Sequence, residues 1–162
     1  MKHHYNRQIK RYIIAVILLV LSGYITIVIK DTLDSRNPDK SLPIISVTTG
    51  YTSVPDSPRA GYEWKFGRKV VRSPFLSPPD VPLIAYDALP ETPILINFSL
   101  PAQQIFVYQG EGLLTTEFTE LRLNVATPQK EGVYVYKVVA QFARGTIVHY
   151  FALDVKRPHM IS

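Results

Sequence analysis

Residues 132–155 read GVYVYKVVAQFARGTIVHYFALDV and contain the clearest structural pattern in this sequence of 162 residues. Apolar and aromatic side chains alternate with other residues over 132–142 and again over 146–155, which is the period of a strand with one buried face. Between the two runs, Gly145 can adopt the positive φ angle that a short hairpin loop requires. The stretch therefore predicts two long antiparallel strands joined by a tight turn.

Each of these strands presents one apolar face. The residues expected to share a face are Tyr134, Tyr136, Val138, Ala140 and Phe142 on the first strand, and Ile147, His149, Phe151, Leu153 and Val155 on the second. The opening Gly132-x-Tyr134-x-Tyr136 is typical of the tyrosine corner of immunoglobulin-like domains, in which a phenol bonds back to nearby backbone. A simple pair of core tyrosines explains the pattern equally well, so both interpretations stay open.

Shorter strand patterns precede the hairpin, at 44–49, 62–66, 81–86, 94–98, 104–109 and 121–125. The region 55–93 contains eight of the thirteen prolines, and proline lacks the donor that a central strand needs. We expect this region to form edge segments and turns over the domain surface. Short strands at regular spacing, without a helical run beside them, predict a mainly β fold: one immunoglobulin-like antiparallel β-sandwich over 44–157, followed by a tail, 158–162.

An uncharged run precedes the β region: residues 12–29 read YIIAVILLVLSGYITIVI. As a helix it would be about 27 Å long, close to the thickness of a bilayer hydrocarbon core. The segment resembles a lipoprotein signal at Leu21-Ser22-Gly23, but Tyr24 stands where the lipid-bearing cysteine would be. No small-residue cleavage pattern follows it. We therefore predict an uncleaved signal anchor, with one transmembrane helix and a short polar stalk, 30–43.

The charge distribution predicts the orientation of this helix. Residues 1–11 form a basic tail with no acid, whereas residues 31–162 carry 13 basic and 13 acidic side chains. The net charge of +5 therefore comes from the residues that flank the span: Lys2, Arg7, Lys10, Arg11 and Lys30. By the positive-inside rule the N-terminus is cytoplasmic and the β domain is extracytoplasmic. The basic excess is a topology signal, and it does not indicate a nucleic-acid partner.

Few side chains suggest chemistry. The chain has no cysteine, which excludes disulfides, thiolate metal sites and a cysteine nucleophile. Of the two histidines after the span, His149 lies on an apolar strand face, where a core or rim histidine is expected, and His159 lies in the tail. Hydrolase and phosphate-binding motifs are missing. We predict no catalytic residues, no metal and no cofactor, and hence a protein that is not an enzyme.

One basic and aromatic cluster is a candidate binding surface. It consists of Arg59, Tyr62, Trp64, Lys65, Arg68, Lys69 and Arg72, with Glu63 as the only acid among them. Such a surface can meet anionic lipid headgroups, an anionic wall polymer or an acidic patch on another envelope protein. The alternative is a solvated edge strand whose charges prevent aggregation. Trp64 is either a core residue or a contact residue, and the sequence leaves both open.

Several motifs together resemble a group of small exported proteins of Bacillus-type Firmicutes, many of them lipoproteins or membrane-anchored proteins. The matching residues are Tyr62 and Trp64, then Pro78, Pro79 and Asp80, then Ile94, Ile96 and Phe98, then Gly132, Tyr134 and Tyr136, and finally Tyr150, Phe151 and Val155. The resemblance covers about 100 residues. It implies an exported, membrane-anchored β domain and no particular activity. This chain departs from the group because it lacks the cysteine pair around the tryptophan segment.

These observations predict a single-pass protein of the bacterial plasma membrane whose external domain is a non-enzymatic binding or accessory module. Its expected partners, besides the membrane itself, are an envelope protein or an anionic wall polymer or lipid. The alternative is a small regulatory subunit that acts on an integral-membrane partner through its helix. A cell-envelope enzyme is the third and least favoured hypothesis.

Overall fold

The computed structural model describes residues 2–50, 52–121 and 125–157, with side chains from residue 10 onward. The elements are α1 Lys2–Arg36, α2 Pro38–Ser41, β1 Ile45–Thr49, β2 Thr52–Val54, β3 Arg59–Phe66, β4 Lys69–Ser73, the 3-10 turn η1 Pro78–Asp80, β5 Ala85–Ala88, β6 Ile94–Phe98, β7 Gln104–Glu111, β8 Thr119–Leu121, β9 Gly132–Phe142 and β10 Gly145–Val155. The chain divides into a helical part, which ends at Ser41, and a β part from Leu42 onward; the turn residues 66–69 group with the helical part.

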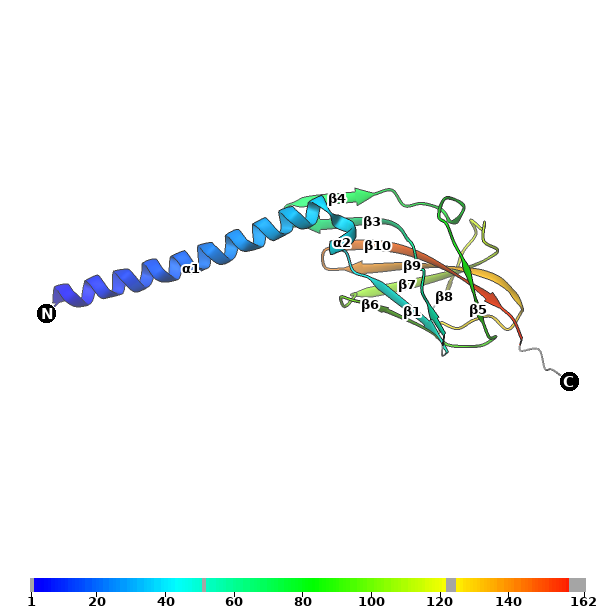
Figure 1. The fold of residues 1–162 in the computed structure, drawn as a ribbon. Coiled ribbons are helices and arrows are strands. Elements are labelled where there is room, and N and C mark those ends of the chain that lie inside the picture. Colours follow the sequence, from blue (N-terminus) through cyan, green and yellow to red (C-terminus); the bar gives the residue numbers. More distant parts are fainter. Residues whose placement is uncertain (1, 51, 122–124, 158–162) are drawn as a thin grey trace. The chain divides into compact units, whose positions relative to one another are not determined.

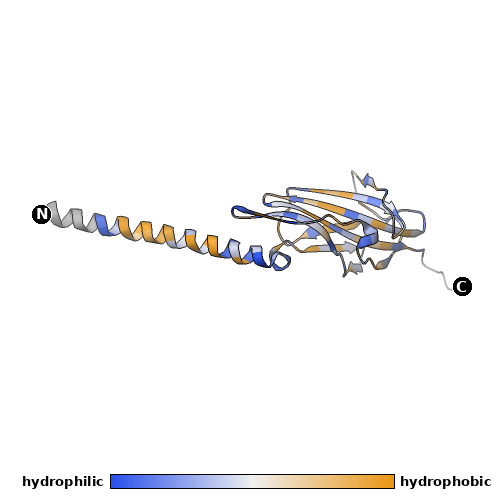
Figure 2. Cartoon of the chain, turned by 90° about the horizontal axis from the view of Figure 1, so that it is seen from above, coloured by the Kyte–Doolittle hydropathy of each residue, from blue (hydrophilic) through white to orange (hydrophobic). Residues whose placement is uncertain are grey.

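Helix α1 contains the apolar run. The segment Lys10–Arg36 has 27 residues, and its most apolar 18-residue window has a mean hydropathy of 2.7 and no residue buried within the protein. Figure 2 shows the middle of this segment as mainly hydrophobic, between hydrophilic residues at its two ends. The chain therefore has an N-terminal helix that is long and apolar enough to cross a membrane.

The polar segment after the apolar run is helical over most of its length. α1 continues through Lys30 to Arg36, and the short helix α2 begins at Pro38. The hydroxyl of Thr32 donates to the carbonyl of Val28 at 2.7 Å, so this polar side chain is satisfied within the helix. α1 ends before Pro38 because proline disfavours helical angles in the preceding residue and suits the first position of a new helix.

The β part consists of two sheets. The large sheet has the order β4-β3-β10-β9-β7-β8, with β5 also paired to β10, and the small sheet has the order β2-β1-β6. β10 pairs antiparallel with β9 over its whole length (Figure 1), with β3 over its first half, and parallel with β5 over its second half. A register shift between Val148 and His149 marks the end of the pairing with β3. β10 is thus the central strand of the domain.

Both faces of the large sheet are covered. The inner face packs against the small sheet around Tyr136, Val138, Phe151 and Leu153, all of which are fully buried. The outer face has a second, smaller core that includes Val135, Val148, Tyr150 and Ala152, with Val81 and Leu83 of the proline-rich region packed on it. The prediction of a mainly β sandwich with one N-terminal apolar helix is therefore confirmed.

The strands agree with the sequence prediction in part: the strand predicted at 81–86 is observed as β5, Ala85–Ala88, and β2 and β4 match no predicted strand. β6 and β9 have the predicted bounds, and β10 begins one residue earlier than predicted. The predicted strand at 121–125 is observed only as β8, Thr119–Leu121, and residues 122–124 lie outside the described residues. The prediction of an all-antiparallel sheet is wrong for one pair, β5 with β10. The immunoglobulin-like connectivity stays a prediction.

The two tyrosines at the start of β9 have different environments. The hydroxyl of Tyr134 donates to the backbone carbonyl of Lys130 at 3.1 Å, which is the hydrogen bond that defines a tyrosine corner. Tyr136 is a core residue, because its ring stacks on that of Phe151 with a centroid distance of 4.9 Å. Each of the two interpretations of this motif therefore describes one of its tyrosines.

The hairpin turn depends on Gly145. Its φ angle is +155°, and a side chain at this position would collide with the backbone carbonyl of Glu63 on β3. Glycine therefore allows β3 to approach the start of β10 closely enough to pair with it. This pairing joins the hairpin β3–β4 to the rest of the large sheet.

Thr127 connects two loops at the end of the sandwich, and we predict that its hydroxyl is required for stability. The hydroxyl accepts a hydrogen bond from the Thr92 amide at 2.8 Å and donates to the Leu89 carbonyl at 2.6 Å, and Thr127 is buried. Thr127→Val keeps the shape but leaves both backbone groups without this partner, so it should lower the free energy of unfolding by about 1–3 kcal/mol.

The measurement is urea unfolding of the full chain in nonionic micelles, followed by the fluorescence of Trp64, the only tryptophan. Thr127→Ser, which keeps the hydroxyl, is the matched control and should lose much less stability. Equal stability of the wild type and the valine variant would contradict the assignment.

Candidate binding face on the large sheet

The predicted basic and aromatic cluster does not form one surface. Tyr62 and Trp64 point into the sandwich and are only 8% and 2% exposed. The ring of Trp64 packs edge-on against Phe142 with a centroid distance of 5.4 Å, and the guanidinium of Arg59 lies over the Tyr62 ring. Tyr62 and Trp64 share the inward face because side chains alternate along β3. The register shift in the pairing with β10 brings Arg59 to the same face, opposite His149. Trp64 is a core residue, so its inclusion in a binding surface is wrong, as is that of Tyr62.

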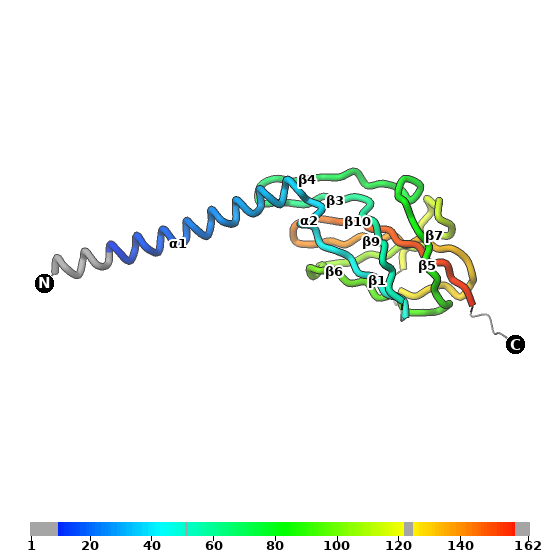
Figure 3. The backbone as a smooth tube through the Cα atoms, in the orientation of Figure 1, coloured from blue at the N-terminus to red at the C-terminus, as the bar shows by residue number. Residues whose placement is uncertain are grey.

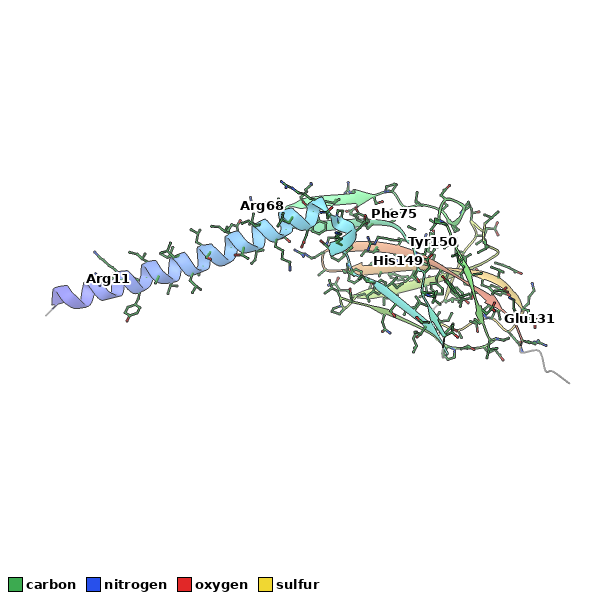
Figure 4. The ribbon with its side chains drawn as sticks, in the orientation of Figure 1. Arg11, Arg68, Phe75, Glu131, His149 and Tyr150 are labelled. Atoms are coloured by element: carbon green, nitrogen blue, oxygen red, sulfur yellow. The ribbon has the colours of Figure 1, made fainter. Side chains whose placement is uncertain are left out.

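The other four residues of the cluster are exposed. Lys65 and Arg72 lie on the outer face of the large sheet, and Arg72 forms a two-point ion pair with Glu63, with an Nε–Oε2 distance of 2.9 Å. Arg68, which Figure 4 labels, and Lys69 lie in the turn region that groups with the helical part. Of the seven residues in the predicted cluster, only Lys65 and Arg72 therefore lie together on the exposed face of the sheet.

The residues that predict the orientation lie along α1. Lys10, Arg11 and Lys30 are exposed on this helix, and the backbone of Lys2 and Arg7 belongs to it. The side chains of Lys2 and Arg7 lie outside the described residues. Nothing in their arrangement shows on which side of a membrane each end lies, so the orientation stays a prediction.

The proline-rich region contributes the wall of a groove on the outer face. Its residues 74–84, here called the crossing segment, follow β4 and pass over β3 and β10 (Figure 3). The Leu76 amide donates to the Ala60 carbonyl at 2.8 Å, and the Tyr150 hydroxyl donates to the Leu76 carbonyl at 3.3 Å. These bonds attach the crossing segment to the outer face of the sheet.

Gly61 makes this close approach possible. A Cβ atom at residue 61 would lie 2.6 Å from the Pro74 carbonyl oxygen and 2.7 Å from the Cα atom of Phe75. Any side chain there would push the crossing segment away from β3. Residues 74–84 run over the domain surface, as expected of the proline-rich region, and Gly61 allows their close approach. The expectation that residues 55–93 form only edge segments and turns is wrong for β3, which is paired with β4 on one side and with β10 on the other.

The crossing segment covers only part of the outer face and leaves a trough beside it. One hollow of about 410 Å³ lies between Phe75, Leu76 and Ser77 of the segment and a floor of Val139, Val148, Thr146, Tyr150 and Lys137. A second hollow of about 500 Å³ continues at Thr146 and is lined by Glu63, Lys65, Val70, Gln103, Gln141, Phe142, Ala143, Arg144 and Gly145. Together these hollows form the candidate site, which we call the outer trough.

The side chains of the outer trough are suited to binding. Phe75 is 55% exposed although it is a large aromatic residue, and Leu76 is 40% exposed. The ammonium of Lys137 lies 5.8 Å from the centre of the Tyr108 ring, where the negative face of the ring attracts it. Exposed aromatic rings beside amide and ammonium groups can hold an amphipathic ligand.

Sequence reasoning missed most of this site. One signal was available: the second face of β9 carries Val133, Val135 and Val139, interrupted by Lys137 and Gln141. A solvated strand face would be polar throughout, so these valines indicated that the outer face is partly covered. Which segment covers it, and where the cover ends, depends on contacts between residues far apart in the sequence.

His149 lies on the inner face and has a structural role. Its Nδ1–H donates to the Ser57 carbonyl at 2.8 Å, its ring lies 6.0 Å from that of Phe98, and its Nε2 atom has no partner among the described residues. Burial lowers the pKa of His149 from 6.5 to about 4; the charge of Arg59 also lowers it, whereas the bond to Ser57 opposes this shift. The histidine is therefore neutral at pH 7, and it is a core residue, as the sequence pattern indicated.

Comparisons with protein-family models, with curated proteins and with solved structures give no match to this chain. The resemblance to small exported proteins of Bacillus-type bacteria therefore stays a prediction.

We predict that His149 destabilises the fold in acid. Because its pKa is lower in the folded chain than the ordinary value of 6.5, the unfolded chain binds one more proton between about pH 6.5 and 4. Stability should therefore be full above pH 6.5 and fall as the pH decreases, with a contribution approaching 1.4 kcal/mol per pH unit.

The measurement is the free energy of unfolding at several pH values between 7 and 4.5, with Trp64 fluorescence as the signal. His149→Gln keeps a hydrogen-bond donor but does not titrate, so its stability should fall less steeply with acid. Parallel curves for the variant and the wild type would show that His149 is not the titrating group.

Proposed function

We propose that this protein is a membrane-anchored binding module of the bacterial cell surface. The apolar part of α1 acts as an uncleaved signal anchor in the plasma membrane, with the basic N-terminus in the cytoplasm. The β-sandwich is displayed outside, where it binds its partner through the outer trough. The proposed binding role is based on the geometry and the side chains of the outer trough.

The length and hydropathy of Lys10–Arg36 support the anchor. The basic tail, on the other side of the span from residues 31–162 with their 13 basic and 13 acidic side chains, supports the orientation. The trough side chains support binding rather than catalysis: they are mainly amide, ammonium, aliphatic and aromatic groups, and the carboxylate of Glu63 is paired with Arg72. The Tyr150 hydroxyl, which could serve as an acid or base, is already bonded to a backbone carbonyl.

The orientation predicts the outcome of proteolysis on intact cells. Protease added to protoplasts should remove the β domain and leave a membrane-bound fragment that contains α1. The measurement is immunoblotting with tags at both ends of the chain. A cytoplasmic protein serves as the control for protoplast integrity, and full protection of the C-terminal tag would show that the orientation is reversed.

Filling the trough should abolish binding. Thr146 lines both hollows, so Thr146→Trp places a large ring where they meet. We expect at least a tenfold loss in cosedimentation of the full chain, held in nonionic micelles, with isolated cell envelopes of a Bacillus-type host. Thr48→Trp is the matched control, because Thr48 is a strand threonine on the outer face of the small sheet.

The control variant should bind like the wild type, and the circular dichroism of both variants should show a folded domain. If Thr146→Trp folds and binds as well as the wild type, the outer trough is not the binding site. If the wild type does not bind envelopes at all, the binding role itself is wrong.

A further inference from the structure

We infer that the outer trough binds a single chain of an anionic polysaccharide, which lies along β9 and β10. This inference rests on the proposed binding function and specifies the chemistry of the ligand. It follows from the way in which the floor of the trough is built, from its charges, and from the kinds of polar group that line it.

The floor offers side chains but no free backbone edge. β10 is hydrogen-bonded to β9 on one side and to β3 on the other, and β9 is also bonded to β7. An extended peptide that adds to a sheet needs an unpaired strand edge. Because the floor consists of interior strands, a ligand in the trough must be recognised through side chains.

The charges favour an anionic ligand. Residues 31–162 carry equal numbers of basic and acidic residues, yet Lys65 and Lys137 both line the trough. Among the described residues that line the two hollows, Glu63 is the only one with a carboxylate, and Arg72 pairs with it. The trough thus has a local excess of positive charge on a part of the chain that is neutral as a whole.

The spacing of these charges favours a polymer. Lys137 lies four residues before Gln141 on β9, which corresponds to about 13 Å at the rise of a strand. Gln141 lines the same hollow as Lys65 and Arg144. Cationic groups therefore lie at both ends of the trough, and they are too far apart to contact the same small anion. A chain with charges repeated along its length can reach both.

The uncharged groups fit a sugar chain. The amides of Gln103 and Gln141 can each donate and accept hydrogen bonds, as the hydroxyls of a sugar do. The ring of Phe75 is more than half exposed beside the floor, and such a flat apolar surface suits the C–H face of a sugar ring. Figure 4 labels Phe75 on the same side of the domain as Tyr150. A wholly apolar chain would leave these amides and ammonium groups without partners.

The test uses the full chain in nonionic micelles and measures binding by fluorescence anisotropy of labelled probes. The probes are alginate oligosaccharides, neutral dextran oligosaccharides, poly-glutamate, single-stranded oligothymidylate and phosphatidylglycerol vesicles. We expect the strongest binding to alginate, weakened at least tenfold by 0.5 M salt because screening removes the charge attraction. Dextran should bind at least tenfold more weakly than alginate.

The preference for alginate over dextran should depend on the lysines that line the trough. Lys137→Gln and Lys65→Gln should each weaken alginate binding about tenfold, whereas Lys137→Arg, which keeps the charge, should bind nearly as the wild type does. Lys130→Gln is the control, since Lys130 pairs with Glu111 and does not line the trough. Trp64 fluorescence verifies that every variant is folded.

The outcomes separate this inference from the proposed function. Equal binding of dextran and alginate, or no effect of Lys137→Gln, would contradict the inference that the ligand is anionic. Stronger binding of poly-glutamate, oligothymidylate or vesicles than of alginate would overturn the polysaccharide. If no probe binds while Thr146→Trp still abolishes cosedimentation with envelopes, the polysaccharide is wrong and the binding module stands. If envelope binding is also missing, both fail.

Discussion

The burial of β10 on both faces is the constraint on which the rest of the structure depends. Eight of its residues are buried, and the strand pairs with β9, β3 and β5. A strand in this position needs apolar cover on each side, because its backbone is fully paired and its side chains project in both directions. The small sheet supplies the cover on the inner face, and the crossing segment supplies part of the cover on the outer face.

The partial cover of the outer face creates the outer trough. Proline suits the crossing segment because this segment lies on the sheet without joining its ladder. It contacts the sheet closely at Gly61, where a side chain would exclude it, and Tyr150 bonds to its backbone. Beyond this contact the floor continues from the buried Val148 through the partly buried Val139 to polar side chains. The trough is therefore a consequence of how far the segment reaches.

Local patterns predicted much of the fold. Alternation over 132–142 and 146–155 identified β9 and β10 almost to the residue, since the side chains that point into the sandwich recur at every second position. The candidate site was predicted less well. Lys65 and Arg72 do lie on one exposed face, but Tyr62 and Trp64, their neighbours in the sequence, point the other way into the core. Proximity along a strand places residues on alternate faces, so a cluster in sequence was not a cluster in space.

The amino-acid sequence alone was sufficient to establish the apolar helix, the mainly β domain, its longest strands and the zero net charge of residues 31–162. Each of these depends on composition or on short-range periodicity. Three features required the three-dimensional arrangement: the parallel pairing of β5 with β10, the approach of the crossing segment at Gly61, and the meeting of Lys65, Phe75, Lys137 and Gln141 around one trough. These residues are separated by up to 76 positions along the chain. No local pattern encodes their proximity, because it arises from the spatial arrangement of the strands on either side of β10.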